Sequence, residues 1–225
     1  ATRMILELCG GEASHIVTAG AVPNTSRIYS LRKSRVASLA GADSASPLRL
    51  DLIMDELARA LPDGAIVCSG AGAYAAALHR HYVYRGFPSQ LAPNSGSMGY
   101  GLPAAIAAKL AHPELPVIAF AGDGCLQMTS HEIATAVQLD LPIVIVVVNN
   151  GVLGTIQNAQ TARANPKVIA TTLVNPDFAV LARAYGALGA RITQTSQFAP
   201  LLKQALAANQ PALIELDMTA HDTES

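Results

Sequence analysis

The chain has 225 residues, of which 51% are hydrophobic and 14% are charged, and its formal net charge at pH 7 is −1. A chain of this length can bury a large core. Its near-neutrality excludes the excess of basic residues with which proteins bind nucleic acids or anionic membranes, so we expect neither partner.

The sequence also limits the compartment in which the protein works. The longest apolar run, residues 141–148, is far shorter than the roughly twenty residues that a membrane-spanning helix needs. No basic and then apolar secretory leader opens the chain, so we expect a cytoplasmic protein. Cys9, Cys68 and Cys125 are odd in number and lack zinc-site spacing, which favours reduced thiols.

The first 47 residues differ in character from the rest. A short apolar run at residues 16–21 is followed by a basic, polar stretch, and residues 41–47 (GADSASP) have the composition of a linker. We expect residues 1–47 to be a linker or the remnant of a preceding central domain. Residues 48–225 would then form one domain.

In that domain, segments with helical periodicity alternate with short apolar strands. This alternation predicts an α/β fold, a doubly wound and mainly parallel sheet of about six strands with helices on both faces. The form T-x-x-E at Thr129–Glu132 predicts a capping box that starts a helix. In chain order we expect helix 50–61, strand 65–68, helices 72–81 and 102–111, strand 117–121, helix 129–137, strand 143–148, helix 177–185, strand 187–192, helix 198–208 and strand 212–216.

Two polar motifs directly follow two consecutive strands. Gly122-Asp123-Gly124 ends the strand at 117–121, and Asn149-Asn150 ends the strand at 143–148. Ligands of open α/β sheets bind at the carboxyl ends of the strands. One carboxylate and one amide oxygen suit Mg²⁺, which usually completes its oxygen coordination with phosphates and water. Because glycines let the backbone approach a phosphate closely, the sequence predicts a metal–diphosphate site.

This arrangement, GDG followed after 24 residues by NN, resembles the fingerprint of thiamine diphosphate-dependent enzymes. Residues 95–105 (SGSMGYGLPAA) are similar to the GxMGxGLPAA segment of the acetolactate synthase and pyruvate decarboxylase group. The resemblance covers about residues 48–218, and ordered agreement at several places makes a chance match improbable. Further landmarks are similar at residues 68–74, 175–178 and 211–215.

The resemblance implies that the chain is the diphosphate-binding (PP) domain of a 2-oxo acid decarboxylase or carboligase, a lyase or transferase that uses thiamine diphosphate and Mg²⁺. It implies that Asp123 and Asn150 bind Mg²⁺ through their side chains and Val152 through its carbonyl. It implies that Met98 holds the cofactor in a bent conformation. The remaining cofactor contacts that we expect are Ala71, Gly72, Ala73, Tyr74, Gly96, Ser97, Gly122, Gly124, Cys125, Leu153 and Gly154.

The chain departs from the family pattern at one position and lacks one expected part. Relatives often have Gln-His where this chain has Ala73-Tyr74, which leaves backbone contacts to the diphosphate but removes two polar side chains. We find no pyrimidine-binding (PYR) domain, which in this family contributes the catalytic glutamate. We therefore expect the chain to be inactive without such a domain, supplied by a longer chain or a partner subunit, and to form a homo-oligomer.

Other interpretations of the same residues remain open at this stage. Asp123 is compatible with a simple turn, Asn149 with holding that turn, and Met98 with filling the core. A non-catalytic binding or regulatory module that retains the fold is the alternative function. A dinucleotide-binding domain is weaker, because the GxGxxG spacing is absent.

Overall fold

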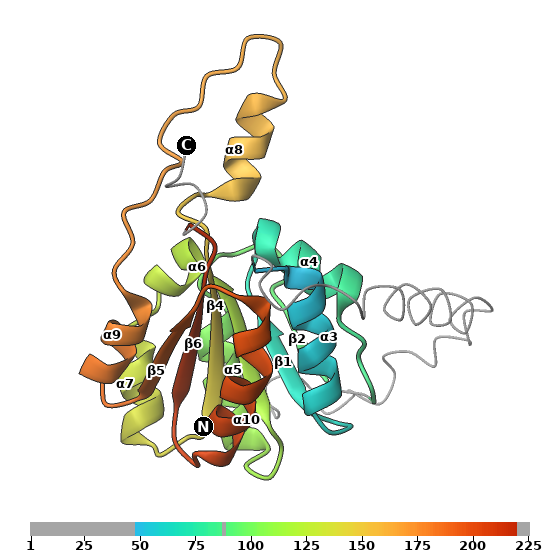
Figure 1. Ribbon diagram of the computed structural model, residues 1–225, viewed down its shortest axis with the longest axis vertical. Helices are drawn as coiled ribbons and strands as arrows, with labels where there is room; N and C mark the ends of the chain where they lie inside the picture. Colours follow the sequence, from blue (N-terminus) through green and yellow to red (C-terminus); the bar gives the residue numbers. More distant parts are fainter. Residues whose placement is uncertain (1–47, 87–88, 220–225) are drawn as a thin grey trace, which may run out of the picture. The chain divides into compact units, whose positions relative to one another are not determined.

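The computed structural model describes residues 48–86 and 89–219, which form a parallel sheet with helices on both sides (Figure 1). The strand order is β2-β1-β3-β4-β6-β5, and every neighbouring pair is parallel. This confirms the doubly wound α/β fold.

The strands are β1 (Ile66–Ser69), β2 (Gln90–Leu91), β3 (Val117–Gly122), β4 (Ile143–Asn149), β5 (Leu188–Ile192) and β6 (Ala212–Asp217). The helices are α3 (Leu50–Ala60), α4 (Ala73–His81), α5 (Gly101–Ala111), α6 (Asp123–Gln127), α7 (Glu132–Gln138), α8 (Gly154–Thr161), α9 (Phe178–Ala184), the 3₁₀-helix η2 (Thr195–Gln197) and α10 (Phe198–Ala207).

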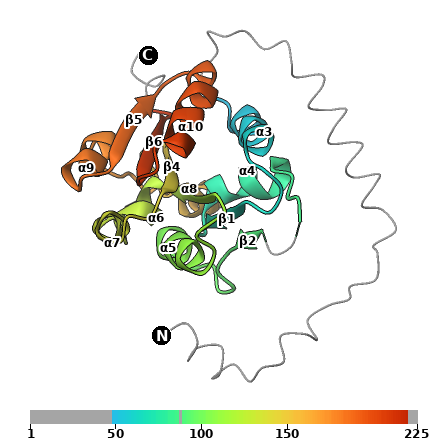
Figure 2. The ribbon, with the colours of Figure 1, turned by 90° about the horizontal axis from the view of Figure 1, so that it is seen from below.

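The sheet separates two apolar cores, each closed by its own group of helices (Figure 2). Helices α3, α4 and α10 cover one face, and α5, α7 and α9 cover the other. The division is visible along β4, where Val144 and Val146 belong to the first core and Ile143 and Ile145 to the second. Because both faces are covered, all seven residues of β4 are buried, which explains its unbroken run of β-branched residues.

The expected capping box at Thr129 is wrong. Helix α7 begins at Glu132, its N-cap residue is His131, and no side chain caps it. The Thr129 hydroxyl instead donates to the Gly99 carbonyl at 3.1 Å, and the Glu132 carboxylate accepts from Thr135 at 2.7 Å. Thr129 therefore ties the segment before α5 to the turn after α6, and it does not start a helix. Asp177, by contrast, caps α9 by accepting from the Val180 N–H at 2.7 Å.

Besides the 3₁₀-helix η2, three elements of the described residues were not expected from the sequence. Helix α6 begins within the GDG motif, whose glycines favour a turn. Helix α8 is polar and buries none of its residues, so it has no apolar periodicity to reveal it. Strand β2 has two residues and pairs only with β1. The sequence patterns that predict helices and strands therefore do not detect these three elements.

Some expectations fall on residues that the structure does not describe. The assignment of residues 1–47 and the state of Cys9 lie outside the described ranges. Cys68 and Cys125 are buried free thiols, as expected, and burial raises the pKa of Cys68 to about 12. Among the described residues, no helix is both long and apolar enough to cross a membrane.

We predict that Gly189→Ala strongly destabilises the domain, because β5 passes directly beneath the backbone of α9. A Cβ atom at Gly189 would lie 2.1 Å from the Ala179 carbonyl oxygen. Backbone atoms cannot move aside as the end of a flexible side chain can. We therefore expect the free energy of unfolding to fall by roughly 3 kcal/mol, as measured by urea denaturation. Ala190→Gly on the same strand is the control and should cost only about 1 kcal/mol. Equal effects of the two variants would contradict the close contact.

Candidate functional site

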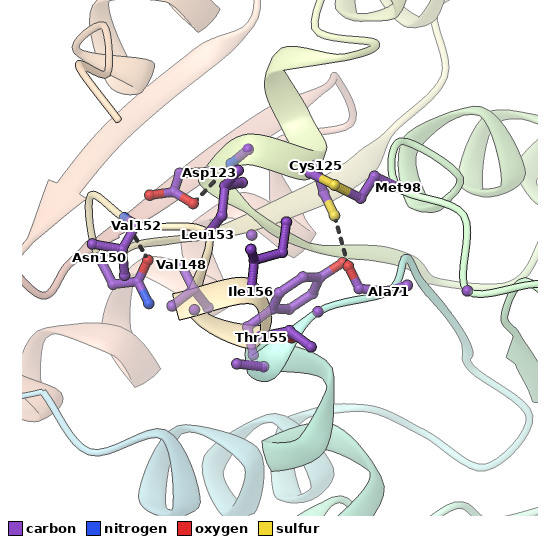
Figure 3. Close-up of a pocket in the computed structure, with 17 residues that line it drawn as sticks. Ala71, Met98, Asp123, Cys125, Val148, Asn150, Val152, Leu153, Thr155 and Ile156 are labelled. Atoms are coloured by element: carbon purple, nitrogen blue, oxygen red, sulfur yellow. Dashed lines mark hydrogen bonds between the residues drawn. The ribbon is translucent and has the colours of Figure 1, made fainter. Parts of the chain in front are cut away.

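A cavity of about 250 Å³ lies at the carboxyl ends of β3 and β4 (Figure 3). Its walls come from four places in the chain: the start of α4, the segment before α5, the β3–α6 turn and the β4–α8 turn. All of the predicted contact residues except Ser97 line this cavity. Ser97 is exposed, and its hydroxyl lies 2.8 Å from that of Ser95. Residues that line the cavity but were not predicted are Val148, Thr155 and Ile156.

Two of the three unpredicted residues share one cause. Val148 is the penultimate residue of β4, and Thr155 and Ile156 lie in the first turn of α8. Because α8 carries no apolar stripe, no pattern in the sequence indicates that its first turn lies at the cavity.

Asp123 is the central polar group of the cavity, and only 3% of its surface is exposed. Its Oδ1 accepts from the Gly124 N–H at 2.7 Å. Its Oδ2 accepts from the Gly151 N–H and from the Asn175 side-chain amide, both at 2.8 Å. Three donors therefore hold this buried carboxylate in one orientation. The Gly124 N–H, expected to face a phosphate, is engaged by this carboxylate.

Asn150 and Val152 add two further oxygens near Asp123 (Figure 3). The Asn150 side-chain oxygen accepts from the Val152 N–H at 3.2 Å, and the Val152 carbonyl accepts from the Gly154 N–H at 3.0 Å. Each oxygen has two lone pairs, so each keeps one free for another ligand. The structure thus brings Asp123, Asn150 and Val152 to the same cavity.

Asn149, the first residue of the NN pair, has a different environment. It is buried, it does not line the cavity, and its side-chain amide donates to the Glu215 carboxylate at 2.7 Å. Its oxygen accepts from the Asn175 amide at 2.7 Å. The structure therefore separates the two asparagines, with Asn150 at the cavity and Asn149 in the protein interior.

Met98 and Cys125 form part of the apolar wall (Figure 3). Met98 is half-buried and packs against the core on the α4 side of the sheet. Its methyl group reaches over the GDG turn, because a Cβ at Gly124 would lie 3.3 Å from Met98 Cε. The Cys125 thiol donates to the Ala71 carbonyl at 3.0 Å. Met98 therefore both packs on the core and borders the cavity.

Tyr74 fills the space left by the missing side chains of neighbouring glycines. A Cβ at Gly122 would lie 2.6 Å from the Tyr74 ring, and one at Gly72 would lie 2.8 Å from it. The ring stacks obliquely on Phe120, with 5.5 Å between centroids. Among the described residues the Tyr74 hydroxyl has no hydrogen-bond partner, and burial beside Cys125 raises its pKa. This buried hydroxyl is a neutral donor at physiological pH.

The donor set of the cavity limits the metals that it can hold. Within the described residues there is no cluster of three or more His, Cys, Asp or Glu side chains suited to a metal ion. Soft or imidazole-binding metals prefer such clusters, whereas a hard cation accepts isolated oxygens and completes its shell from a ligand. Helix α4 also begins here without a side-chain cap, which leaves N–H groups of its first turn available.

Known proteins share both the sequence and the fold of this domain. Residues 70–216 match the family described as thiamine pyrophosphate enzyme, C-terminal TPP binding domain. The acetolactate synthase large subunit of Haemophilus influenzae is 33% identical over 181 residues, which cover 76% of this chain and 30% of that protein. The mitochondrial acetolactate synthase catalytic subunit of Saccharomyces cerevisiae is 34% identical over 154 residues, 68% of this chain and 22% of that protein.

A solved structure agrees with these matches. The thiamine diphosphate-dependent 4-hydroxybenzoylformate decarboxylase of Rhodococcus jostii RHA1 superposes with a TM-score of 0.72 and 29% sequence identity, covering 79% of this chain and 34% of that chain. The present chain thus spans about a third or less of the length of these relatives. The family match includes both the GDG turn and the NN pair. The chain belongs to the thiamine pyrophosphate enzymes and contains their C-terminal cofactor-binding domain.

Proposed function

We propose that this chain binds thiamine diphosphate through Mg²⁺ and supplies the diphosphate half of the active site of a 2-oxo acid decarboxylase or carboligase, similar to acetolactate synthase. The observation that carries the proposal is that Asp123, Asn150 and Val152, which can offer a carboxylate, an amide and a backbone carbonyl oxygen, line one cavity together with several glycines. Three protein oxygens are half of an octahedral shell, and phosphates and water can supply the rest.

The Asp123 and Asn150 side chains and the Val152 carbonyl would hold the cation. The diphosphate would then lie against the backbone of Ala71–Ala73, where the unsatisfied N–H groups at the start of α4 favour an anion. The glycines fit this task, since the space beside Gly122 is already taken by Tyr74 and any larger residue there would push the ring into the cavity.

The apolar part of the cavity would hold the organic part of the cofactor. Met98, Leu153 and Ile156 line this part with apolar side chains. Met98 is placed to fix the orientation of the rings, because its side chain projects over the GDG turn from the opposite side to Leu153. When bound, thiamine diphosphate supplies an electron sink for making or breaking the bond beside the carbonyl of a 2-oxo acid.

A second domain is part of the proposal. Among the described residues, Asp123 is the sole carboxylate that lines the cavity, and its oxygens are held by three donors. No carboxylate therefore remains there to exchange protons with the cofactor. We infer that a pyrimidine-binding domain supplies it, from the same longer chain or from a partner subunit, in a cytoplasmic homo-oligomer.

One observation favours a second candidate, a binding or regulatory module without turnover. Ala73 and Tyr74 provide no polar side chain at positions where relatives often carry Gln and His, and the Tyr74 hydroxyl is buried. The cradle formed by Ala71–Ala73 would then bind the diphosphate through backbone groups alone. Turnover by the assembled protein separates the two candidates.

We predict that Asp123→Ala abolishes Mg²⁺-dependent binding of thiamine diphosphate. Loss of a direct ligand should cost more than the 10- to 100-fold typical of outer-shell partners, as measured by calorimetric titration with and without Mg²⁺. Glu114→Ala, which removes an exposed carboxylate before the amino end of β3, should bind normally. Unchanged affinity of Asp123→Ala, or equal affinity of the wild type in excess chelator, would show that the metal site is misassigned.

We predict that Met98→Ala lowers turnover of the complete enzyme by roughly 100-fold while changing cofactor affinity little, because a misplaced reactive group costs rate rather than binding. Steady-state kinetics and cofactor titration measure the two effects. Met128→Ala is the control, since Met128 is largely exposed outside the cavity. A fall in melting temperature without a specific loss of turnover would instead assign Met98 to the core.

We predict that the 225-residue chain alone, saturated with Mg²⁺ and thiamine diphosphate, releases no CO₂ from any 2-oxo acid. The cavity would leave the pyrimidine ring without a carboxylate partner and open to water. The assay is CO₂ release from a panel of 2-oxo acids, repeated after a pyrimidine-binding domain is added. Robust turnover by the chain alone would mean that it contains an unrecognised acid or base.

A further inference from the structure

A continuous series of polar side chains runs from the cavity into the protein interior. Its first link is Asn175, in the loop before α9, whose amide donates to Asp123 at 2.8 Å and to Asn149 at 2.7 Å. The Asn175 oxygen accepts from Gln127 at 2.6 Å. Both amide protons and the oxygen of Asn175 are thus engaged, which fixes the orientation of the side chain completely.

The series continues to a carboxylate that is entirely buried. Glu215 of β6 has no exposed surface, and it accepts from Asn149 at 2.7 Å, from the Ala179 N–H at 3.2 Å and from Arg191 at 2.9 Å. Hydrogen bonding to Glu215 raises the pKa of Arg191, so this cation stays charged. A buried carboxylate with a charged partner and two further donors is a rigid anchor, because losing Arg191 would leave an unpaired buried charge and losing either neutral donor would leave a buried acceptor unsatisfied.

The hydrogen bonds distinguish the two oxygens of Asp123. Each carboxylate oxygen offers about two lone pairs. The Gly151 N–H and the Asn175 amide occupy both lone pairs of Oδ2, whereas the Gly124 N–H takes only one of those of Oδ1. Oδ1 therefore retains one lone pair for a cation. Without Asn175, Oδ2 would have a free lone pair as well, and the carboxylate could turn.

Asn175 also lies at the base of the segment that carries α8. Leu173 donates to the Gly151 carbonyl, and Leu153 donates to the Thr171 carbonyl, both at 2.7 Å. The two ends of the segment are thereby held together, while α8 stands beyond the carboxyl edge of the sheet (Figure 1). Asn175 follows this closure by two residues. The same amide that orients Asp123 therefore ties the base of this segment to the strands that carry the metal ligands.

We propose that Asn175 is a positioning residue for the metal site: it holds Asp123 so that a single oxygen faces the cation, and Glu215 fixes Asn175 through Asn149. The proposal rests on the proposed function of Asp123 as a ligand of Mg²⁺. Its consequence is selectivity. Mg²⁺ demands near-ideal octahedral geometry, whereas Ca²⁺ accepts irregular geometry and bidentate carboxylates. Loosening Asp123 should therefore harm Mg²⁺ binding more than Ca²⁺ binding.

The test compares Mg²⁺ and Ca²⁺ affinities of the full protein in the presence of saturating thiamine diphosphate, by calorimetric titration well below the melting temperature. Asn175→Ala removes the donor, and Asn175→Asp keeps its shape but places an acceptor against Asp123 and Asn149. Gln127→Ala is the matched control, since it removes only the outer hydrogen bond of Asn175. If Asn175→Ala does not fold, Asn175→Asp gives the same readout.

We expect Asn175→Ala to lose 10- to 100-fold in Mg²⁺ affinity, as is usual for groups that orient a ligand, and to lose clearly less in Ca²⁺ affinity. Asn175→Asp should lose more than Asn175→Ala, and Gln127→Ala should stay within about threefold of the wild type. Equal losses for both cations, or an unchanged Mg²⁺ affinity in the Asn175 variants, would overturn the proposal. If the wild type itself shows no metal-dependent binding, or Asp123→Ala retains it, the proposed function fails instead, so the two failures are distinguishable.

Discussion

The pairing of β3 with β4 is the constraint on which the rest of the site depends. Gly122 lies opposite Val148 in parallel register, so Asp123 and Asn150 leave the sheet at the same edge. Two ligands of one Mg²⁺ can be no more than about 4.2 Å apart, and neighbouring strands are about 4.8 Å apart. Side chains bridge that spacing easily. A strand between the two would double that distance to about 9.6 Å.

The same edge has to accommodate polar groups at the ends of strands that are otherwise apolar. Asn149 and Glu215 lie on adjacent strands, β4 and β6, two residues apart in register, and both are buried. An unpaired buried amide or carboxylate is costly, so each must find partners within the protein. The Asn149 amide donates to Glu215. Asn175 donates to the Asn149 oxygen, and Arg191 donates to Glu215. The hydrogen bonds that satisfy these buried groups thus connect the cavity to the protein interior.

Much of this arrangement follows from local sequence, and the rest follows from contacts that local sequence cannot contain. The apolar runs of β3 and β4 and the motifs that end them predicted the sheet and the cavity edge. The bond from Asn175 to Asp123 joins residues 52 positions apart, and Thr129 bonds a carbonyl 30 positions away. The Thr129 bond overrode a capping signal. The metal and cofactor roles of the cavity residues remain predictions.

Tyr74 shows how a departure from the family pattern can change the physical basis of binding. Relatives often carry Gln and His at positions 73 and 74, which would offer polar side chains to the diphosphate. Here the ring is turned inward against Gly72, Gly122 and Phe120, and it supports the cradle from beneath. The diphosphate would then be bound by backbone groups, whose positions depend on the strands and on α4. Because backbone donors carry no net charge, the proposed cation at Asp123 would have to balance most of the diphosphate charge, and the orientation of this one carboxylate would then be decisive for the whole site.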